Sequence, residues 1–576
     1  MRLRTFARAS GFLPVSMSAR PEPVDRDANA NIARHLSLMA ASRPEMPALK
    51  VFRGRTSTGD IDYLTLTFAE LASEVEAWRS RLIAHGVQRG DRTLVMVRPG
   101  LPLIASVFAL FQLGAVPVII DPGMGLKNFL GCVARSRPRA LVGIPFARFV
   151  SHVFRSAFSS VAVRVPASGS LVARLKPDKS QISDLKSGIV VSKADDLAAI
   201  LFTSGSTGAP KGVCYEHGMF DAQVRLIREA YGIAPGEIDL PMLPIFALFN
   251  PALGLTTIVP EIDPRHPARV DPARIVQAIL QEKVTNSFGS PTLWRKIFDY
   301  CLARDIKLPT LRRVLCAGAP VPLSLYVDSQ KILPNGILCS PYGATEALPV
   351  SSTHTFEVLA KDVLSDSVRY GTCVGRPLAN MEVRIIAITD TPISSITETR
   401  ELSRGEIGEI IVRGPVVTRV YDGLEKATAA AKIRDGETVW HRMGDCGRVD
   451  EAGRLWFCGR KAERVTTPVG TLFTDPCEQV FRSTFAGLRV ALIGLGQPGQ
   501  MTPALVVEDS PIARDRELFF GIVRQTAQAH PHTAGIRRFF IHPQFPVDTR
   551  HNAKIHRLAL AKWAATAKAF VEDSES

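Results

Sequence analysis

The residues with the clearest chemical meaning form a loop rich in glycine, serine and threonine that follows an apolar run. The segment Leu201–Val213 contains three glycines and several hydroxyl side chains, and its polar part ends on Lys211. Glycines let backbone N–H groups converge on an anion, hydroxyl groups add donors, and the lysine adds a positive charge. The loop is therefore predicted to hold the phosphates of a nucleotide. The alternative is a polar surface turn. The segment is not a Walker A loop, because neither Ser nor Thr follows Lys211.

Four further segments carry residue types suited to the same chemistry: Ser340–Glu346, Gly405–Ile410, His441–Asp445 and His551–Ile555. A carboxylate becomes a good acyl donor only when one of its oxygens joins a leaving group such as AMP, which brings two anions together. Mg²⁺ must then neutralise the phosphates, and Glu346 offers the hard oxygen ligand that this ion prefers. Taken singly, Glu346 and Asp445 could equally be surface or capping carboxylates.

These segments must be positioned by alternating strands and helices. The strand-like runs are Arg92–Val97, Leu197–Phe202, Arg313–Cys316 and Glu409–Val412, and helical patterns cover Phe68–His85 and Pro272–Glu282. This alternation predicts an α/β fold built in layers. After Arg460 a shorter set of strands and helices follows. We therefore expect a disordered extension over 1–30, a large domain over 31–459 and a small C-terminal domain over 460–576.

Two conspicuous stretches are predicted to be structural. The run 101–120 is apolar enough to cross a bilayer, but Gly114 and Pro117 divide it into a helix over 101–113 and a buried strand over 116–120. The run Gly494–Gly499 matches the dinucleotide pattern G-x-G-x-x-G. A strand over 504–507 follows it, instead of the helix whose N-terminus would bind pyrophosphate, so we expect a connecting turn.

Composition narrows the class of protein. The chain has 576 residues, of which 46% are hydrophobic and 22% charged, as in folded globular proteins with several modules. Its net charge of +15 suits anionic substrates, nucleic acid or a membrane surface, but the charge is diffuse and no aromatic platform for nucleic acid is visible. The nine scattered cysteines predict neither zinc nor disulfides and favour the cytoplasm. The arginine-rich N-terminus could be a transit peptide, but we favour a disordered extension, with Met1 or Met17 as the start.

Together, the loop and the four segments resemble the adenylate-forming superfamily over residues 35–565, and the loop and the Tyr-Gly-Ala-Thr-Glu run are the most specific matches. The resemblance implies a large multi-sheet N-terminal adenylation domain and a small, mobile α+β C-terminal domain. It also implies ATP and Mg²⁺ as cofactors. The residues that it assigns to nucleotide binding are Thr203, Ser204, Gly205, Ser206, Thr207, Gly208, Lys211, Gly318, Ala319, Pro320, Tyr342, Gly343, Asp445 and Arg460.

The resemblance also implies individual roles. The backbone of Ala317–Pro320 and Tyr342–Gly343 would enclose adenine, and Asp445, assisted by Arg460, would bind both ribose hydroxyls. The residues implied in catalysis are Thr345 at the α-phosphate, Glu346 as the metal ligand, and Lys554. Lys554 would bridge carboxylate and α-phosphate oxygens as charge builds during attack. A basic C-terminal face is the alternative for Lys554, because His551, Arg557 and Lys562 are its neighbours.

Three runs resemble one branch of the superfamily: Ile120–Leu126, Leu243–Pro251 and Glu261–Arg269. Members of that branch adenylate a long-chain 2-alkyl-3-hydroxy fatty acid, whose β-hydroxyl then closes a β-lactone ring during olefin biosynthesis. The resemblance implies assembly with the lactone decarboxylase and ketone reductase of that pathway. Either an acyl channel or core packing would account for Phe246, Leu248, Phe249, Pro251 and Leu253. His217 and His441 have side chains suited to moving the hydroxyl proton, and neither is assigned.

The segment after Gly459 departs from the superfamily pattern. Ala462 stands where a charged residue is usual, and Val465–Pro468 is also atypical. In the superfamily this region rotates after adenylation and helps to admit coenzyme A, so the departure weakens the expectation of thioester formation and leaves adenylation untouched. A long-chain fatty acyl-CoA ligase is the alternative function, and a basic nucleic-acid-binding protein is the alternative from another class.

Overall fold

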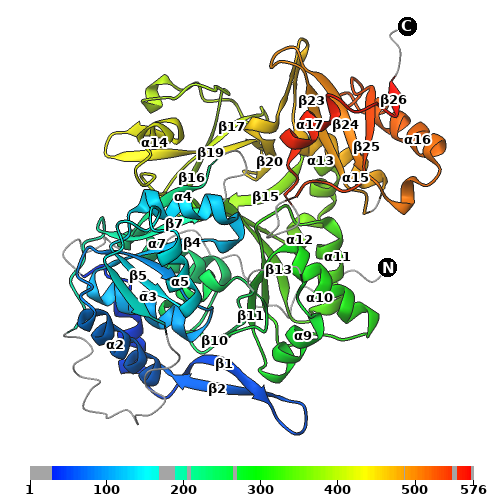
Figure 1. Ribbon diagram of the computed structural model, residues 1–576. Helices are drawn as coiled ribbons and strands as arrows, with labels where there is room; N and C mark the ends of the chain where they lie inside the picture. The colour runs from blue at the N-terminus through cyan, green and yellow to red at the C-terminus, as the bar shows by residue number, and fades with distance from the viewer. Residues whose placement is uncertain are drawn as a thin grey trace.

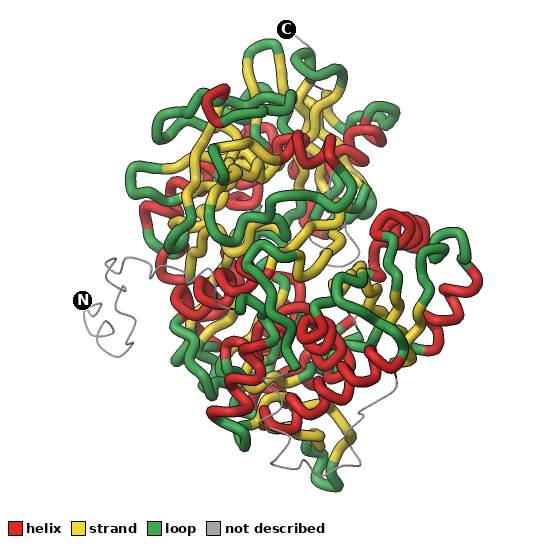
Figure 2. The backbone as a smooth tube through the Cα atoms, turned by 90° about the vertical axis from the view of Figure 1, so that its left-hand side faces the viewer, coloured by secondary structure: helices red, strands yellow, loops and turns green. Residues whose placement is uncertain are grey.

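The computed structural model describes residues 29–167, 188–203, 209–263, 269–485, 487–547 and 554–572. Within these residues the strands form four sheets, of fourteen, six, four and two strands. The elements after β20 gather at the upper right of Figure 1, away from the six-stranded sheet. Seen from the side, strands are flanked by helices, and one lobe projects from the main body (Figure 2). The predicted extension over 1–30 falls almost wholly outside the described residues.

The six-stranded sheet carries the predicted phosphate loop. Its order is β6-β5-β3-β4-β7-β8, parallel except for the β7–β8 pair. The strands are β3 (Arg92–Met96), β4 (Val116–Ile120), β5 (Ala140–Gly143), β6 (Val163–Pro166), β7 (Leu197–Thr203) and β8 (Lys211–Glu216). The helices around it are α1 (Arg34–Ser42), α2 (Phe68–Ala84), α3 (Leu101–Leu113), α4 (Leu126–Ser136), α5 (Pro145–Val153) and α7 (His217–Tyr231).

The fourteen-stranded sheet carries the other predicted segments of the large domain. Its order is β16-β17-β19-β20-β15-β14-β13-β12-β11-β9-β10-β1-β2, with β18 paired to β19. The strands are β1 (Pro47–Arg55), β2 (Ile61–Thr67), β9 (Ile238–Asp239), β10 (Thr256–Ile258), β11 (Asn286–Gly289), β12 (Arg313–Cys316), β13 (Ile337–Ala344), β14 (Ala347–His354), β15 (Thr372–Pro377), β16 (Glu382–Ile386), β17 (Gly408–Arg413), β18 (Lys432–Asp435), β19 (Thr438–Val449) and β20 (Leu455–Arg460). Its helices are α8 (Asn250–Leu253), α9 (Pro272–Gln281), α10 (Pro291–Ala303), α11 (Leu323–Ile332), α12 (Thr355–Val358), α13 (Lys361–Tyr370) and α14 (Glu425–Ala431).

Hydrophobic packing stacks the two large sheets in layers. One core joins α2, α3 and α7 to both the six-stranded sheet and strands β11–β13, so these helices form the layer between the sheets. A second core covers the opposite face of β12 and β13 with α9, α10 and α11. A third covers the outer face of the six-stranded sheet with α4 and α5. The predicted α/β fold class is therefore confirmed, with two sheets and three helical layers.

The C-terminal part has its own sheet and cores. Its strands are β21 (Val465–Thr467), β22 (Gly470–Leu472), β23 (Val490–Leu495), β24 (Thr502–Glu508), β25 (Arg538–His542) and β26 (Val571–Glu572), and its helices are α15 (Thr474–Thr484), α16 (Arg516–Gln528) and α17 (Arg557–Ala564). Two hydrophobic cores cover the two faces of its sheet. In chain order, β20 is the last strand of the fourteen-stranded sheet, and it ends at Arg460.

The structure confirms the predictions for the apolar run 101–120 and for the run Gly494–Gly499. The apolar run 101–120 divides into α3 and β4, and Gly114 ends the helix in the left-handed conformation that glycine adopts without strain. No helix among the described residues is long and apolar enough to cross a membrane. The run Gly494–Gly499 leads from the end of β23 toward β24, and the two strands pair antiparallel, so a connecting turn replaces the dinucleotide helix.

Candidate active site

The predicted phosphate loop joins the ends of two neighbouring strands. Thr203 ends β7 and pairs in register with Lys211, the first residue of β8. Five of the predicted residues, Ser204, Gly205, Ser206, Thr207 and Gly208, lie outside the described residues. After the loop, the Pro210 carbonyl oxygen accepts a hydrogen bond of 2.7 Å from Arg135 of α4. The strand pair thus fixes the point from which the Lys211 side chain extends.

Lys211 and Glu346 are joined through a tyrosine that sequence reasoning missed. The Lys211 ammonium lies 4.8 Å from the ring centroid of Tyr421, a cation–π contact. The Tyr421 hydroxyl donates a hydrogen bond of 2.8 Å to Glu346 Oε1. Burial, reinforced by the Glu346 carboxylate, raises the pKa of Tyr421, so its hydroxyl keeps the proton that it donates. This contact brings the phosphate loop and the predicted metal ligand to one place.

The backbone around Glu346 is held from two sides. Thr418 donates to the Glu346 carbonyl oxygen through its backbone N–H at 2.9 Å and its hydroxyl at 3.1 Å. The Tyr215 hydroxyl donates to the Thr345 carbonyl oxygen at 2.6 Å. A Cβ at Gly343, near the end of β13, would lie 2.4 Å from the Ala347 carbonyl oxygen, so the strand accepts only glycine just before its turn into β14. The predicted Thr345 and Glu346 therefore occupy a turn of fixed shape.

A buried lysine supports this arrangement. Lys432 is 6% exposed, and its ammonium donates to the Thr418 carbonyl oxygen and, at 3.1 Å, to the Thr418 hydroxyl. Burial lowers the pKa of Lys432 to about 7, while the Glu346 carboxylate acts in the opposite direction. Both acceptors are neutral, and the ion pairs of the described residues include none for Lys432. The ammonium therefore lies close to Glu346 without a salt bridge of its own.

The two histidines considered for proton transfer are both buried. His441 pairs in register with Lys432, and burial together with the charges of Lys432 and Lys211 lowers its pKa well below the ordinary value. His217 begins α7, in the helical layer between the sheets. Its ring and that of Phe111 pack edge to face, with centroids 5.9 Å apart. Burial lowers the pKa of His217 to about 4. Both rings are therefore weak bases.

Asp445 is the centre of a second group of charges. Its carboxylate is 3% exposed and accepts hydrogen bonds of 2.7 Å from both the Tyr342 hydroxyl and the Arg460 guanidinium. Burial raises the pKa of Asp445, whereas Arg460, Tyr342 and, more weakly, Lys554 oppose that shift. Asp445 in turn raises the pKa of Arg460, and the Glu346 charge adds to it. These influences place the two charge groups and Lys554 within electrostatic reach of one another.

Lys554 reaches this group from the C-terminal part of the chain. It is half-buried and precedes Ile555, whose backbone bridges to Val547, and then α17. The adjoining residues 548–553 lie outside the described residues. The predicted Gly318, Ala319 and Pro320 follow the carboxyl end of β12, and Gly318 has a φ of 97°. Because β12 and β13 are parallel neighbours, these residues lie at the same sheet edge as the chain that continues from Ser340.

The apolar residues predicted for an acyl channel fall into two groups. Pro251 and Leu253 are buried in α8 and serve the core. Phe246, Leu248 and Phe249 are only partly buried, on a 3₁₀ turn over Pro244–Phe249. The Phe246 ring stacks on Phe288 near the carboxyl end of β11, with ring centroids 3.8 Å apart. Only the second group leaves apolar surface uncovered at this sheet edge.

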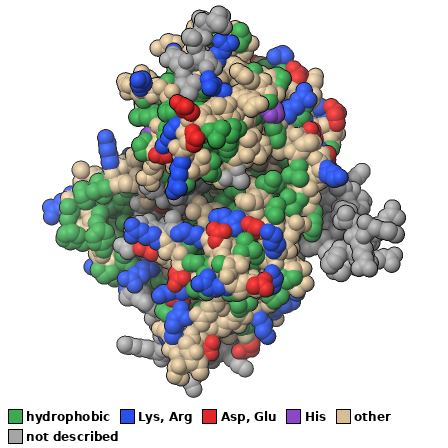
Figure 3. Space-filling view, turned by 90° about the vertical axis from the view of Figure 1, so that its right-hand side faces the viewer, with side chains coloured by type: hydrophobic (Ala, Val, Ile, Leu, Met, Phe, Trp, Pro, Cys, Tyr) green, Lys and Arg blue, Asp and Glu red, His purple; other side chains and the backbone are tan. Residues whose placement is uncertain are grey.

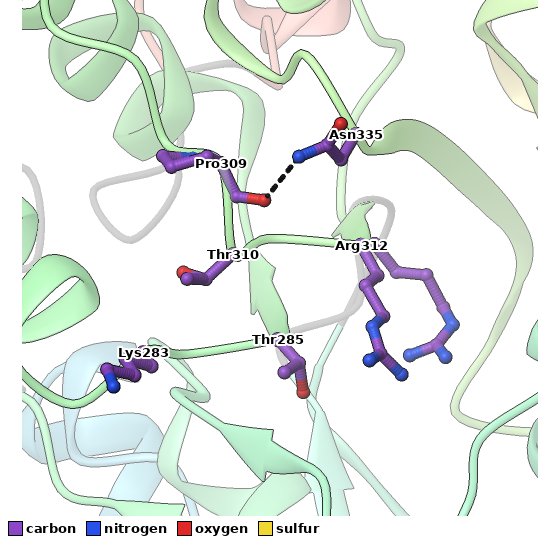
Figure 4. Close-up of a pocket in the computed structure, with 7 residues that line it drawn as sticks. Lys283, Thr285, Pro309, Thr310, Arg312 and Asn335 are labelled. Atoms are coloured by element: carbon purple, nitrogen blue, oxygen red, sulfur yellow. Dashed lines mark hydrogen bonds between the residues drawn. The ribbon is translucent and has the colours of Figure 1, made fainter. Parts of the chain in front are cut away.

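A cavity of about 460 Å³ lies elsewhere (Figure 4). Thr285, Arg312 and Asn335, which line it, each precede one of the parallel strands β11, β12 and β13. Asn335 donates to the Pro309 carbonyl oxygen at 3.1 Å across its rim. The cavity is therefore at the amino ends of these strands, opposite the edge that carries the predicted site residues.

Known proteins share both the sequence and the fold. Residues 38–422 match the family described as AMP-binding enzyme. The chain is 43% identical over 553 residues to an olefin beta-lactone synthetase of Xanthomonas campestris. The alignment covers 93% of this chain and 97% of that protein. It is equally 43% identical, over 557 residues, to an olefin beta-lactone synthetase of Stenotrophomonas maltophilia, with 93% and 98% covered.

Solved structures with the same fold are more distant in sequence. An amide bond synthetase of Marinactinospora thermotolerans has a TM-score of 0.73 at 21% identity, covering 93% of this chain and all of that one. An o-succinylbenzoate coenzyme A synthetase of Bacillus subtilis, in complex with ATP and magnesium ion, has a TM-score of 0.69 at 21% identity, covering 91% and 98%. At 21% identity, this likeness shows a shared fold and nothing more.

Proposed function

Since the chain belongs to the AMP-binding enzyme family, we propose that it is an ATP-dependent ligase that converts a long-chain 2-alkyl-3-hydroxy fatty acid into a β-lactone. The carboxylate oxygen attacks the α-phosphorus of ATP and pyrophosphate leaves. The β-hydroxyl oxygen then attacks the acyl carbon, AMP leaves with the carboxyl oxygen, and the hydroxyl proton passes to solvent. The observation that carries the proposal is the 43% identity, over 93% of the chain, to relatives named olefin beta-lactone synthetase.

The phosphate end of the site has the charge that such a reaction needs. Lys211 and Lys432 supply two cations around Glu346, and the Tyr421 hydroxyl donates its hydrogen bond to Oε1 of that carboxylate. A carboxylate of this kind fits Mg²⁺, which when bound would neutralise phosphate charge. We assign Lys211 and the loop Thr203–Gly208 to the phosphates and Thr345 to the α-phosphate. Lys432 and Thr418 position Glu346 through its backbone.

The ribose end fits two hydroxyl groups. Arg460 and Tyr342 oppose the rise that burial causes in the pKa of Asp445, and a carboxylate can accept further hydrogen bonds from ribose hydroxyls. Gly318–Pro320 and Gly343 offer backbone at the same sheet edge for the adenine ring. Lys554, whose charge already reaches Asp445, would hold the carboxylate and α-phosphate oxygens together as negative charge builds.

Ring closure requires no second substrate. The hydroxyl is tethered two carbons from the acyl carbon, so its effective concentration is high once the substrate is folded toward the adenylate. The partly exposed apolar surface of Phe246, Leu248 and Phe249 is suited to holding the alkyl chains in that position. We place the boundary between the two domains at Arg460, where β20 ends.

The site of action and the partners belong to the same proposal. All nine cysteines are free thiols and eight are buried, which fits a reducing cytoplasm.

We infer assembly with the lactone decarboxylase and ketone reductase of the olefin pathway, because a β-lactone is strained and its direct transfer would limit hydrolysis. Co-purification of the three enzymes expressed together would test this. A ligase that elutes alone would contradict it.

Product analysis without coenzyme A tests the reaction. The protein is incubated with ATP, Mg²⁺ and a 2-alkyl-3-hydroxy acid, and mass spectrometry should detect the cyclic product that has lost one water. A matched 2-alkyl acid without the hydroxyl should release pyrophosphate and give no lactone. If the hydroxy acid yields no cyclic product, and a thioester forms once coenzyme A is added, the protein is an acyl-CoA ligase instead.

A further inference from the structure

Helix α5 exposes an apolar stripe on the outside of the molecule. Phe146, Phe149 and Val153 are 68%, 64% and 55% exposed, whereas Ala147 and Ser151 on the inner side of the helix are buried. Positions separated by three, four and seven residues lie on one helical face. Two phenylalanines exposed to this degree on one face are uncommon on a protein that keeps its surface in water.

The neighbouring helix α4 extends the same surface. Phe129 and Val133 of α4 and Val150 of α5 pack into one core on the outer face of the six-stranded sheet, so both helices belong to one layer. Leu126, at the start of α4, is 55% exposed. Figure 3 shows hydrophobic side chains bordered by Lys and Arg side chains on the lobe that projects to the left. We call the exposed side of α4 and α5 the outer apolar surface.

This part of the chain has only one sign of charge. Residues 122–167 contain seven basic residues and no Asp or Glu: the basic ones are Lys127, Arg135, Arg137, Arg139, Arg148, Arg155 and Arg164. With 55 acidic residues in 576, a stretch of this length would carry about four. Lys127, Arg137 and Arg155 are exposed, and no described ion pair neutralises them. Three exposed cations without a described ion pair therefore lie in or just after the two helices that form the outer apolar surface.

We propose that the outer apolar surface docks on a lipid bilayer that carries anionic headgroups. Phenylalanine side chains gain free energy by entering the boundary between headgroups and acyl chains, and lysine and arginine beside them are attracted to lipid phosphates. Charge complementarity favours this occupant, because a bilayer with anionic lipids presents one sign of charge whereas the surface of a protein partner mixes both signs. Docking is a property separate from the proposed lactone synthesis. It would place a ligase for long-chain acids beside the membrane in which such acids dissolve.

Vesicle sedimentation tests the docking. Wild-type protein is mixed with vesicles of phosphatidylcholine alone or with added phosphatidylglycerol, at low and at physiological salt. We expect sedimentation with the anionic vesicles and a weaker response at higher salt. The variant Phe146→Ser/Phe149→Ser should lose about tenfold or more of its partition. The variant Arg137→Glu/Arg155→Glu should lose the preference for anionic lipid.

A second exposed apolar pair provides the control. Leu323 and Val327 on α11 are 48% and 39% exposed, and Leu323→Ser/Val327→Ser should sediment like the wild type. The proposal is overturned if the wild type stays in the supernatant, or if Phe146→Ser/Phe149→Ser sediments to the same extent as Leu323→Ser/Val327→Ser. If Phe146→Ser/Phe149→Ser instead changes the molar mass in light scattering while vesicles bind neither protein, the surface is a protein interface and the lipid proposal is wrong. Pyrophosphate release with a short, water-soluble acid reports separately on the proposed ligase activity.

Discussion

The two ends of the proposed nucleotide site treat buried charge in opposite ways. At the ribose end, Asp445 is neutralised by Arg460 and hydrogen-bonded by Tyr342. At the phosphate end, Lys211 contacts an aromatic ring and Lys432 contacts neutral oxygens, with Glu346 as the nearby carboxylate. A closed charge pair suits uncharged hydroxyl groups, whereas surplus positive charge suits a polyanion. We therefore expect removal of a charge to weaken ATP binding at both ends, but to lower the stability of the protein only at the ribose end.

Lys554→Ala should have the largest effect, because this residue serves the reacting atoms between the two ends. We expect pyrophosphate release to fall by about 10²- to 10³-fold, as when one transition-state donor is removed, while ATP binding survives. The matched control is Lys562→Ala, an exposed lysine on α17. Unchanged pyrophosphate release in the Lys554 variant would remove this residue from the mechanism.

Asp445→Asn tests the ribose end. The change keeps the shape of the side chain but leaves the Arg460 guanidinium without its counter-charge. We expect ATP binding to weaken by roughly 10- to 100-fold and the melting temperature to fall. Adding Arg460→Met should recover stability without recovering ATP affinity. If calorimetry finds wild-type ATP affinity in Asp445→Asn, the ribose assignment is incorrect.

Lys432→Met tests the phosphate end and should separate binding from stability. Because methionine removes a buried ammonium that lacks an ion pair, we expect an unchanged or higher melting temperature. Affinity for Mg²⁺-ATP should fall by about tenfold, since one cation is lost. Lys426→Met, at an exposed position of α14, is the control. A lower melting temperature with unchanged ATP affinity would make Lys432 purely structural.

The phosphate end should also respond to pH. Burial lowers the pKa of Lys432 to about 7 in the free protein, with Glu346 opposing the shift, while the nearby His441 stays neutral because its own pKa is lower still. A bound polyanion favours the ammonium form, so binding takes up a proton above pH 7 and none well below it. ATP affinity should therefore fall by at most about tenfold per pH unit above 7. The Lys432→Met variant should lack this dependence; an identical slope in both proteins would assign the proton elsewhere.

Glu346→Gln should have the smallest effect. The amide oxygen can still accept the Tyr421 hydrogen bond, so the turn keeps its shape while the negative charge is lost. We expect several-fold more Mg²⁺ for half-maximal pyrophosphate release at saturating ATP. A metal titration that matches the wild type would exclude Glu346 as the ligand.

Much of the fold could be predicted from local pattern. Gly114 and Pro117 mark the change from α3 to β4, since glycine ends a helix and a β-branched run follows. The strand after Gly494–Gly499 was enough to exclude a dinucleotide site. Such signals are encoded by neighbouring residues. The phosphate loop itself was the strongest signal in the sequence, and most of its residues lie outside the described part of the structure.

The supporting residues of the phosphate end could not be predicted in this way. Lys432 follows three alanines and resembles an exposed helical lysine, but α14 ends at Ala431 and the next strand carries Lys432 into the interior. Tyr421 and Thr418 contact Glu346 across more than seventy residues of chain. Their partners are set by the pairing of β18 with β19 and by the turn after β13, which a single sequence does not reveal.

The alanine in the segment after β20 has a mechanical consequence. On one side of it, Arg460 is bonded to Asp445 and Lys461 to Glu409, both in the fourteen-stranded sheet. On the other side, Glu463 is bonded to Arg557 of α17. Two residues after Ala462, Arg464 is bonded back to Asp390 and to the Lys461 carbonyl oxygen, so the contacts of the two parts overlap around this exposed alanine. A rotation of the C-terminal part about this segment would therefore first have to break the Arg464–Asp390 ion pair, which holds the arrangement described here.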